Sequence, residues 1–440
     1  MNKSFILLAL ASIVIVNKAD AQLTATSVDN GNWTSTSTWD CSGVPCVPTA
    51  GYDVTIATNV TLDMNFEVLS ASNSLTINAG ASLVQDATPR AISIISTGSV
   101  TSSGDLTVAT FSLAVAGGTF TTSGFGASTI TTLSNLGTVQ NDATMSIAGG
   151  SNYGTFTNGK TLNLSIFSNF GTFTNNQNIT FTDITNLAGG TFTNANGSSM
   201  NGTNFVNLGT LTNNGYINLS INFSSLGGIT YNNGSIIPFN DCYTNGSFVN
   251  SASGFLAVGN DYVNGDTTNI FNGVMINDGR IEVGNDFVNV DTIQGTGYIC
   301  VAAGSVNTGW FLGTFDFCDT TILTSGDTVD VNIGLIESGI TTCTGTACFT
   351  LNPLGIENIS NHNSIKIYPN PAGDMLYIEI EKHQTLRFEL FNVAGQQVLS
   401  INESSGSHFS VDLSSLKGGC YLLKSTDKDG SYTSQIIVKQ

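Results

Sequence analysis

The chain carries few residues suited to acid–base or nucleophilic catalysis. Its three histidines, His362, His383 and His408, all lie near the C-terminal end. Histidine is the side chain that most often moves protons near neutral pH, because its pKa lies closest to that range. Residues 22–352 contain no histidine and therefore no Ser-His or Cys-His pair. We predict no catalytic residue in this body of the protein.

Two carboxylates offer a remaining route to catalysis. The heptapeptide VGNDYVN recurs 25 residues later as VGNDFVN, which places Asp261 and Asp286 at equivalent positions. Two carboxylates suffice for glycoside hydrolysis, and carboxylates in neighbouring repeats also suit calcium. The interpretation we favour is that each Asp caps a turn beside an asparagine, Asn260 or Asn285. We expect no metal or other cofactor, with calcium as the minor alternative.

Eight cysteines predict an oxidising destination, because disulfides persist outside reducing compartments. Three local pairs suggest themselves: Cys41 with Cys46, Cys300 with Cys318, and Cys343 with Cys348. Cys242 and Cys420 remain as expected free buried thiols, since they belong to different predicted domains. The alternative is that all eight are unpaired core residues. Zinc is disfavoured, because no pair has C-x2-C spacing and no histidine is near one.

The body is strongly acidic. It holds three basic residues, Arg90, Lys160 and Arg280, against 21 Asp and Glu, whereas residues 353–440 hold seven against nine. A surface of this sign repels phosphate, so nucleic acid is not an expected partner.

A sequence repeat indicates which elements position these residues. The glycines that open successive units lie 17 to 19 residues apart: Gly137, Gly154, Gly171, Gly190, Gly209, Gly228 and Gly246. Such a period is typical of stacked repeat proteins. Within a unit, as in Thr172-Phe173-Thr174, apolar and polar residues alternate with period two, which indicates strands. We predict an all-β fold, a parallel β-helix (β-solenoid) over residues 53–320.

The motif GTFTN gives each position in the unit a role. The apolar residues should stack inward: Phe156, Phe173, Phe192 and Leu211. The asparagines should adopt the left-handed backbone of a turn and bond through their amides to the coils above and below. They are Asn158, Asn175, Asn194, Asn213 and Asn232. The threonines should point outward: Thr155, Thr157, Thr172, Thr174, Thr191, Thr193, Thr210 and Thr212.

Four stacked coils would then show a flat, uncharged grid of hydroxyl groups. Such a face suits neutral glycans, ice, or lateral packing on another solenoid. The Thr-x-Thr pattern resembles the ladders of ice-binding solenoids, but it breaks at Ile229-Thr230-Tyr231. Threonine also favours strands, so the alternative is that this face is exposed to solvent and binds no ligand.

The segments that flank the repeats should protect the open ends of the solenoid. Residues 22–52 are predicted to form the N-terminal cap around Trp33 and Trp39, although the two indole rings could instead stack on sugars. Residues 321–352 should form the C-terminal cap and the start of a linker. Residues 1–21 have the layout of a cleavable signal peptide, and no later apolar stretch is long enough for a transmembrane helix.

Residues 353–440 differ in composition and form a separate predicted domain. Alternating stretches at 376–380, 387–391, 421–424 and 435–438 indicate a small antiparallel, Ig-like β-sandwich. Four motifs follow in order: Tyr368-Pro369-Asn370-Pro371, Phe388 to Gly395, Leu416-Lys417-Gly418-Gly419-Cys420-Tyr421, and Val438-Lys439-Gln440. Together they resemble the type A C-terminal sorting domain of the type IX secretion system of Bacteroidota. The resemblance implies that the outer-membrane translocon reads this tail and a sortase removes it, and that the body is anchored to surface lipopolysaccharide or released.

These features favour an exported, non-enzymatic solenoid that acts as an adhesin or binds matrix or neutral glycans. The alternatives are a carbohydrate-active enzyme that uses carboxylates only, and an ice-binding solenoid.

Overall fold

The structure is a computed structural model in which the chain forms two units, Met1–Thr350 and Leu351–Gln440. It describes residues 23–265, 273–321, 329–342, 365–368, 372–380, 386–392, 397–404, 408–417, 419–427 and 432–439. The predicted signal peptide and the pair Cys343 and Cys348 lie outside these residues.

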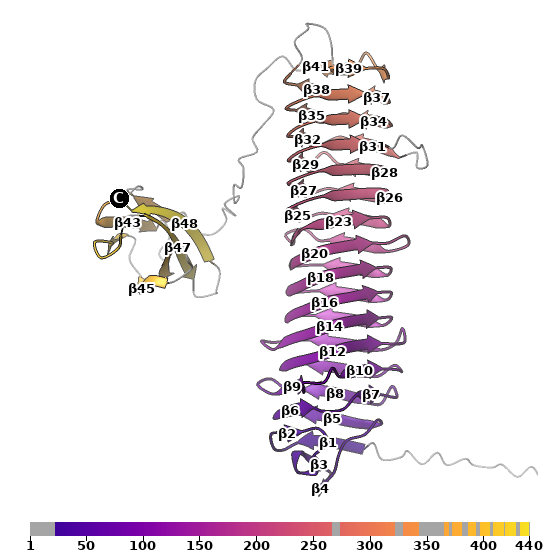
Figure 1. Cartoon of the computed structure of the whole chain (residues 1–440), viewed down its shortest axis with the longest axis vertical. Helices are drawn as coiled ribbons and strands as arrows, with labels where there is room; N and C mark the ends of the chain where they lie inside the picture. Colours follow the sequence, from indigo (N-terminus) through magenta and orange to yellow (C-terminus); the bar gives the residue numbers. More distant parts are fainter. Residues whose placement is uncertain are drawn as a thin grey trace, which may run out of the picture. The chain divides into compact units, whose positions relative to one another are not determined.

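The first unit is a parallel β-solenoid, as predicted (Figure 1). Each full coil contributes to three columns of strands, here called sheets 1, 2 and 3. A strand pairs in parallel with its equivalent one coil away and in matching register, as in Thr155 with Thr172 and Phe156 with Phe173. The period of 17 to 19 residues therefore corresponds to one turn of the coil.

The strand bounds are as follows. Sheet 1 contains β1 Leu23–Ser27, β5 Tyr52–Ile56, β8 Ser74–Ile77, β11 Ser99–Ser102, β13 Thr119–Thr122, β15 Thr138–Asn141, β17 Thr155–Asn158, β19 Thr172–Asn175, β21 Thr191–Asn194, β24 Thr210–Asn213, β31 Val274–Asn277, β34 Thr292–Gly295, β37 Trp310–Gly313 and β40 Leu335–Ile336. Sheet 2 contains β2 Gly31–Asn32, β6 Asn59–Leu62, β9 Ser82–Gln85, β22 Ser199–Gly202, β25 Tyr216–Leu219, β27 Ser235–Pro238, β29 Phe255–Val258, β32 Arg280–Val283, β35 Tyr298–Val301, β38 Asp316–Asp319 and β41 Thr341–Thr342. Sheet 3 contains β7 Phe66–Val68, β10 Ala91–Ile94, β23 Asn204–Asn207, β30 Tyr262–Asn264, β33 Phe287–Asn289, β36 Ser305–Asn307 and β39 Val331–Asn332. Long strands continue from sheet 2 into sheet 3: β12 Asp105–Leu113, β14 Ala127–Asn135, β16 Thr144–Asn152, β18 Thr161–Asn169 and β20 Asn178–Asn186. Two others continue from sheet 3 into sheet 1: β26 Phe223–Asn232 and β28 Cys242–Asn250.

The interior is a continuous apolar core made by the inward residues of all three sheets. Phe156, Phe173, Phe192 and Leu211 are fully buried, as the alternation predicts. The rings of Phe156 and Phe173 stack 4.8 Å apart and those of Phe173 and Phe192 4.5 Å apart, each pair close to parallel. Identical residues at identical positions therefore fill the core by repetition.

The N-terminal cap contains the 3-10 helix η1 Thr36–Thr38 and the strands β3 Trp39–Cys41 and β4 Val44–Pro45. Trp33 and Trp39 are buried there, and their indole N–H groups donate to the backbone oxygens of Pro48 and Trp33. Both rings are core residues, so the alternative that they stack on sugars is wrong. The Cys41–Cys46 disulfide closes this segment, as predicted.

Both ends of the solenoid extend beyond residues 53–320. At the start, β1 already pairs in parallel with β5. At the end, β39, β40 and β41 pair in parallel with β36, β37 and β38, so residues 331–342 build one more coil within the predicted cap.

The second unit consists of two small antiparallel sheets. One contains β42 Ile365–Tyr368, β43 Met375–Ile380 and β46 His408–Asp412. The other contains β44 Leu386–Asn392, β45 Gln397–Ser404, β47 Gly419–Asp427 and β48 Tyr432–Lys439. All four strands predicted for this domain fall within these elements.

Candidate functional site

Buried asparagine columns fix the corners of the solenoid. In sheet 1 each asparagine donates from Nδ2 to Oδ1 of its equivalent in the next coil, at 2.8 to 2.9 Å. The members are Asn141, Asn158, Asn175, Asn194, Asn213, Asn232, Asn250 and Asn277, all fully buried. The amide bonding expected from the sequence is therefore confirmed, and it extends in both directions beyond the expected residues.

The left-handed backbone expected for these asparagines is wrong. Among the described residues, Ser42 is the one non-glycine with a positive φ. The asparagines end extended strands and point inward, where they also bond the turn that follows. Asn175, for example, donates to the backbone oxygen of Gln177 at 2.9 Å. The asparagine side chain thus bonds the backbone of the corner from the interior of the solenoid, and the residues that follow the asparagine form the turn.

A second asparagine column, which the sequence reasoning missed, ends the strands of sheet 3. Asn135, Asn152, Asn169, Asn186 and Asn207 are linked in the same way at 2.6 to 2.8 Å. Ser225 and Thr244 interrupt the column, which resumes with Asn264, Asn289, Asn307 and Asn332. The available signal was the recurrence of asparagine two residues before the glycine of several repeats.

Sheet 1 presents the candidate binding surface, here called the threonine face. It consists of the outward residues of the eight consecutive strands β8, β11, β13, β15, β17, β19, β21 and β24. One column contains Ser74, Ser99, Thr119, Thr138, Thr155, Thr172, Thr191 and Thr210. The other contains Thr76, Thr101, Thr121, Gln140, Thr157, Thr174, Thr193 and Thr212.

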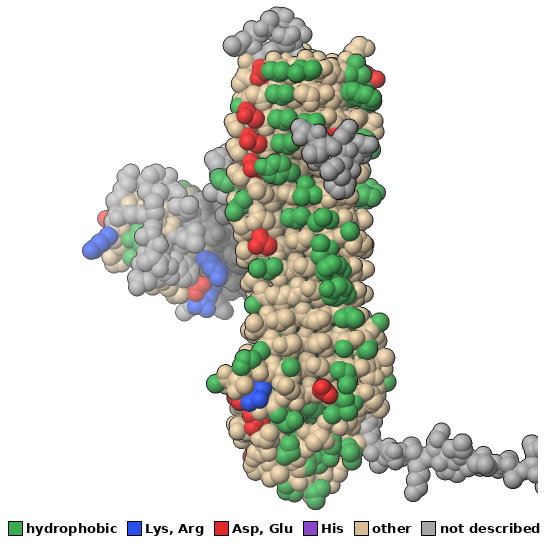
Figure 2. Space-filling model, turned by 45° about the vertical axis from the view of Figure 1, so that its right-hand side comes forward, with side chains coloured by type: hydrophobic (Ala, Val, Ile, Leu, Met, Phe, Trp, Pro, Cys, Tyr) green, Lys and Arg blue, Asp and Glu red, His purple; other side chains and the backbone are tan. Residues whose placement is uncertain are grey.

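The face is uncharged and larger than predicted. All eight threonines named from the sequence are exposed or half-buried, and four further coils continue their columns toward the N-terminus. Strand geometry places hydroxyl groups about 4.8 Å apart between coils and about 7 Å apart along a strand. Figure 2 shows how few charged side chains the visible side of the solenoid carries.

The threonine face ends where the sequence pattern breaks. Ile229 and Tyr231 replace threonine as the outward pair and are exposed. Thr230 points inward, because it is the register partner of the buried Leu211, and it accepts a hydrogen bond from Asn207. Farther along, Val274 and Trp310 continue the same outward column as exposed apolar residues.

Asp261 and Asp286 lie in one corner column but cap turns of the following coil. Asp261 accepts from the amide of Asn285 at 2.7 Å and from the backbone of Asp286 at 3.2 Å, all on Oδ1. Asp286 accepts from the backbone N–H of Gly304 at 3.0 Å. Within the described ranges, no three His, Cys, Asp or Glu residues are grouped to hold a metal ion.

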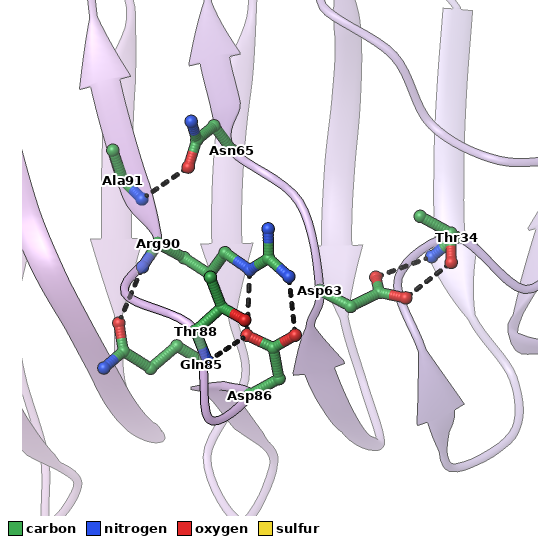
Figure 3. A network of polar contacts seen from close by, with 8 residues as sticks. All are labelled: Thr34, Asp63, Asn65, Gln85, Asp86, Thr88, Arg90 and Ala91. Atoms are coloured by element: carbon green, nitrogen blue, oxygen red, sulfur yellow. Dashed lines mark hydrogen bonds and ion pairs between the residues drawn. The ribbon is translucent and has the colours of Figure 1, made fainter.

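Arg90 and Lys160, two of the three cations of the body, interact with neighbouring residues. Arg90 forms a two-pronged ion pair with Asp86, and this interaction lowers the pKa of the Asp86 carboxyl (Figure 3). Lys160 donates to the backbone oxygen of Gly124 and lies over the ring of the exposed Phe125.

Arg280 belongs to a hollow at the surface of sheet 2. Its lining includes Asp278, Arg280, Glu282, Tyr298 and Asp316. Arg280 forms an ion pair with Glu282, whose side chain is fully buried. Burial raises the pKa of the Glu282 carboxyl above its ordinary value, and the Arg280 charge offsets this only in part. Sequence reasoning missed this cluster, because the alternation in the strand predicts that the side chain of Glu282 points outward into solvent.

The raised pKa of Glu282 predicts a pH-dependent stability. The folded protein holds this proton more tightly than the unfolded chain, so the contribution is present below the unfolded pKa and is lost as pH rises through the folded pKa. The melting temperature of Glu282→Gln should therefore rise relative to that of the wild type as the pH increases above the ordinary pKa of a glutamate, about 4.3. The exposed substitution Glu67→Gln is the control, and a pH-independent difference for Glu282→Gln would contradict the prediction.

Three further cysteines belong to the described part of the solenoid. Cys300 and Cys318 are register partners in the outward column of sheet 2 that also contains Glu282, and each is disulfide-bonded. The structure describes no bond between the two, so the predicted Cys300–Cys318 pair is not confirmed. Cys242 is free and buried, and burial raises the pKa of its thiol, which makes it a poor nucleophile. The side chain of Cys420 lies outside the described residues.

Comparison with known proteins assigns the second unit. Residues 366–439 match a family model described as a secretion system C-terminal sorting domain. The tail is a type IX sorting domain. The sorting domain indicates an exported protein that is secreted or attached to the cell surface. Among the described residues, no helix is both long and apolar enough to cross a membrane.

For the solenoid, the comparisons give no basis for assigning a function. No curated protein matches the chain. A crystal structure of a chitinase from Paenibacillus sp. strain FPU-7, described as a cell-surface-expressed multi-modular enzyme, aligns at 10% identity with a TM-score of 0.14. The alignment covers 89% of this chain and 24% of that one. So low a score carries no argument.

Within the sorting domain, the last predicted motif contacts the residues that follow the first one. Lys439 forms an ion pair with Asp374 at 3.0 Å and bridges to Ala372 through the backbone. Tyr368 stacks on Tyr377, and the Tyr421 hydroxyl donates to the backbone oxygen of Lys417. Five of the predicted motif residues lie outside the described residues: Pro369, Asn370, Pro371, Gly395 and Gly418.

Proposed function

We propose that this exported solenoid is a non-catalytic adhesin or matrix protein that binds a neutral polysaccharide through its threonine face. The supporting observation is the register-matched double column of hydroxyl groups over eight coils. Hydroxyl groups both donate and accept hydrogen bonds, so they match the hydroxyl groups of a neutral glycan.

The regularity of the face favours an extended ligand. Each coil offers the same weak contacts, and a polymer that engages many coils adds them without further loss of translational freedom. A charged polymer would find no counter-charge on the face. Sheet 3 is the poorer candidate, because it carries one continuous column of hydroxyls, Ser93, Ser112, Ser134, Ser151, Ser168 and Thr185, while Gly149 and Ile166 interrupt the other.

The test is retention of the protein on insoluble neutral polysaccharides. Thr174→Tyr places a bulky ring in the centre of the face and should weaken retention on the order of tenfold, which is about 1.4 kcal/mol. Thr180→Tyr is the matched control, because Thr180 is an exposed threonine of β20 that points outward from sheet 2. Equal retention of both variants and the wild type would overturn the proposal.

Ice is the second candidate ligand, favoured by the two-dimensional regularity of the same columns. Thermal hysteresis of the wild type that Thr174→Tyr abolishes, without retention on any polysaccharide, would replace the glycan proposal with this one.

A further inference from the structure

The hollow on sheet 2 is the one described surface feature that departs from the repeat in both charge and burial. In its outward column, Phe255, Arg280, Tyr298 and Asp316 follow one another in register. Asp278 borders it from the adjoining corner. Two aromatic residues therefore lie on either side of a single arginine.

Arg280 is held in place and remains accessible. Its guanidinium lies 5.5 Å from the ring centre of Tyr298 and pairs with the Glu282 carboxylate, while 45% of the side chain is exposed. A guanidinium carries five N–H donors, so one ion pair leaves several of them free for a ligand. The arginine is thus an oriented donor at the surface of the hollow.

Glu282 is the unusual member of the cluster. It is fully buried, and apart from the ion pair neither carboxylate oxygen has a hydrogen-bond partner within the described part of the chain. The equivalent positions in the coils on either side are Ala257 and Cys300, also buried. The fold accepts small uncharged residues at this position, and burying a carboxylate costs free energy. Packing alone therefore does not explain why the position holds a glutamate.

The charges around the hollow select the class of ligand. Asp278, Glu282 and Asp316 outnumber Arg280, which disfavours an anion. Within the described ranges no metal-binding group is present, and Arg280 would repel a cation at the centre. An apolar ligand would leave the guanidinium donors unsatisfied.

We propose that this hollow binds a single unit of a neutral sugar. Its hydroxyl groups accept from Arg280 and donate to Asp278 and Asp316, whose described hydrogen bonds all use Oδ1. Its C–H face packs on Phe255 or Tyr298. Glu282 is a positioning residue that holds the guanidinium. The inference shares only its ligand class with the proposed function, because the site lies on a different sheet.

The test is isothermal titration of the full chain with neutral trisaccharides of glucose, xylose and N-acetylglucosamine, and with trigalacturonate as the acidic probe. These ligands are too short to span the threonine face. One neutral trisaccharide should bind at one site per chain, and Arg280→Gln should weaken it at least about tenfold. Arg90→Gln is the matched control, since Arg90 is also partly exposed and ion-paired but lies far along the sequence in another coil.

The role of Glu282 has its own readout. Wild-type affinity should fall as acid protonates Glu282 and releases the guanidinium, whereas the affinity of Glu282→Gln should be weaker and should not follow this titration. No binding of any neutral trisaccharide, unchanged binding by Arg280→Gln, or tighter binding of trigalacturonate would overturn the inference. Thr174→Tyr should leave trisaccharide binding intact and Arg280→Gln should leave polysaccharide retention intact, so the two proposals fail separately.

Discussion

Asn175→Ala is expected to lower the free energy of unfolding of the solenoid by about 2 to 5 kcal/mol, because buried polar groups are left without partners. The wild-type amide accepts from Asn158 and donates to Asn194, each at 2.8 Å, and also bonds the backbone of Gln177. Alanine removes all of these bonds and leaves a cavity where no solvent enters. Chemical denaturation followed by circular dichroism measures the loss.

The neighbouring Asn176→Ala is the control for this substitution. Asn176 is exposed and makes no described side-chain hydrogen bond, so its replacement should change stability by less than about 0.5 kcal/mol. Equal effects of the two substitutions would show that the asparagine column does not hold the coils together.

Gly154→Val is also expected to lower the free energy of unfolding strongly, by about 3 kcal/mol or more. A Cβ atom on Gly154 would lie 2.1 Å from the carbonyl oxygen of Gly137 in the preceding coil. That atom belongs to backbone and cannot swing aside, so neighbouring coils would have to separate and lose their hydrogen bonds. Denaturation and limited proteolysis near residue 154 both report the damage.

Gly149→Val serves as the matched control. Gly149 lies in the outward column of β16, where the next coil carries Ile166, and a Cβ there meets no atom closer than 3.9 Å. Valine should fit and favour the strand. A loss of stability at Gly149 as large as at Gly154 would contradict the explanation by close approach.

The architecture was predictable because every coil repeats the same alternation of apolar and polar residues. The period-two alternation placed Phe173 inside and Thr172 outside. A register error of one residue would have exchanged the inward and outward side chains in every coil. The backbone of the asparagines was not predictable in this way. Asparagine tolerates both a left-handed turn and an extended strand end, and the inward column that decides between them requires a partner 17 or 19 residues away.

Of the two candidate sites, one could be predicted from the repeat and the other could not. The threonine face could be located from the sequence, although its N-terminal extension through Ser99 and Thr119 was hidden by irregular spacing. The hollow could not, because it depends on how Phe255, Arg280 and Tyr298 come into register from coils of different length. Departures from a repeat are informative only once the stacking is known.

The asparagine columns have a direction. From Asn141 to Asn277 every amide donates toward the C-terminal end, and the column of sheet 3 runs the same way. A whole coil added or removed would still receive a donor from one neighbour and offer a donor to the other. Whole coils can therefore be gained or lost in evolution without leaving an asparagine of the column unpaired.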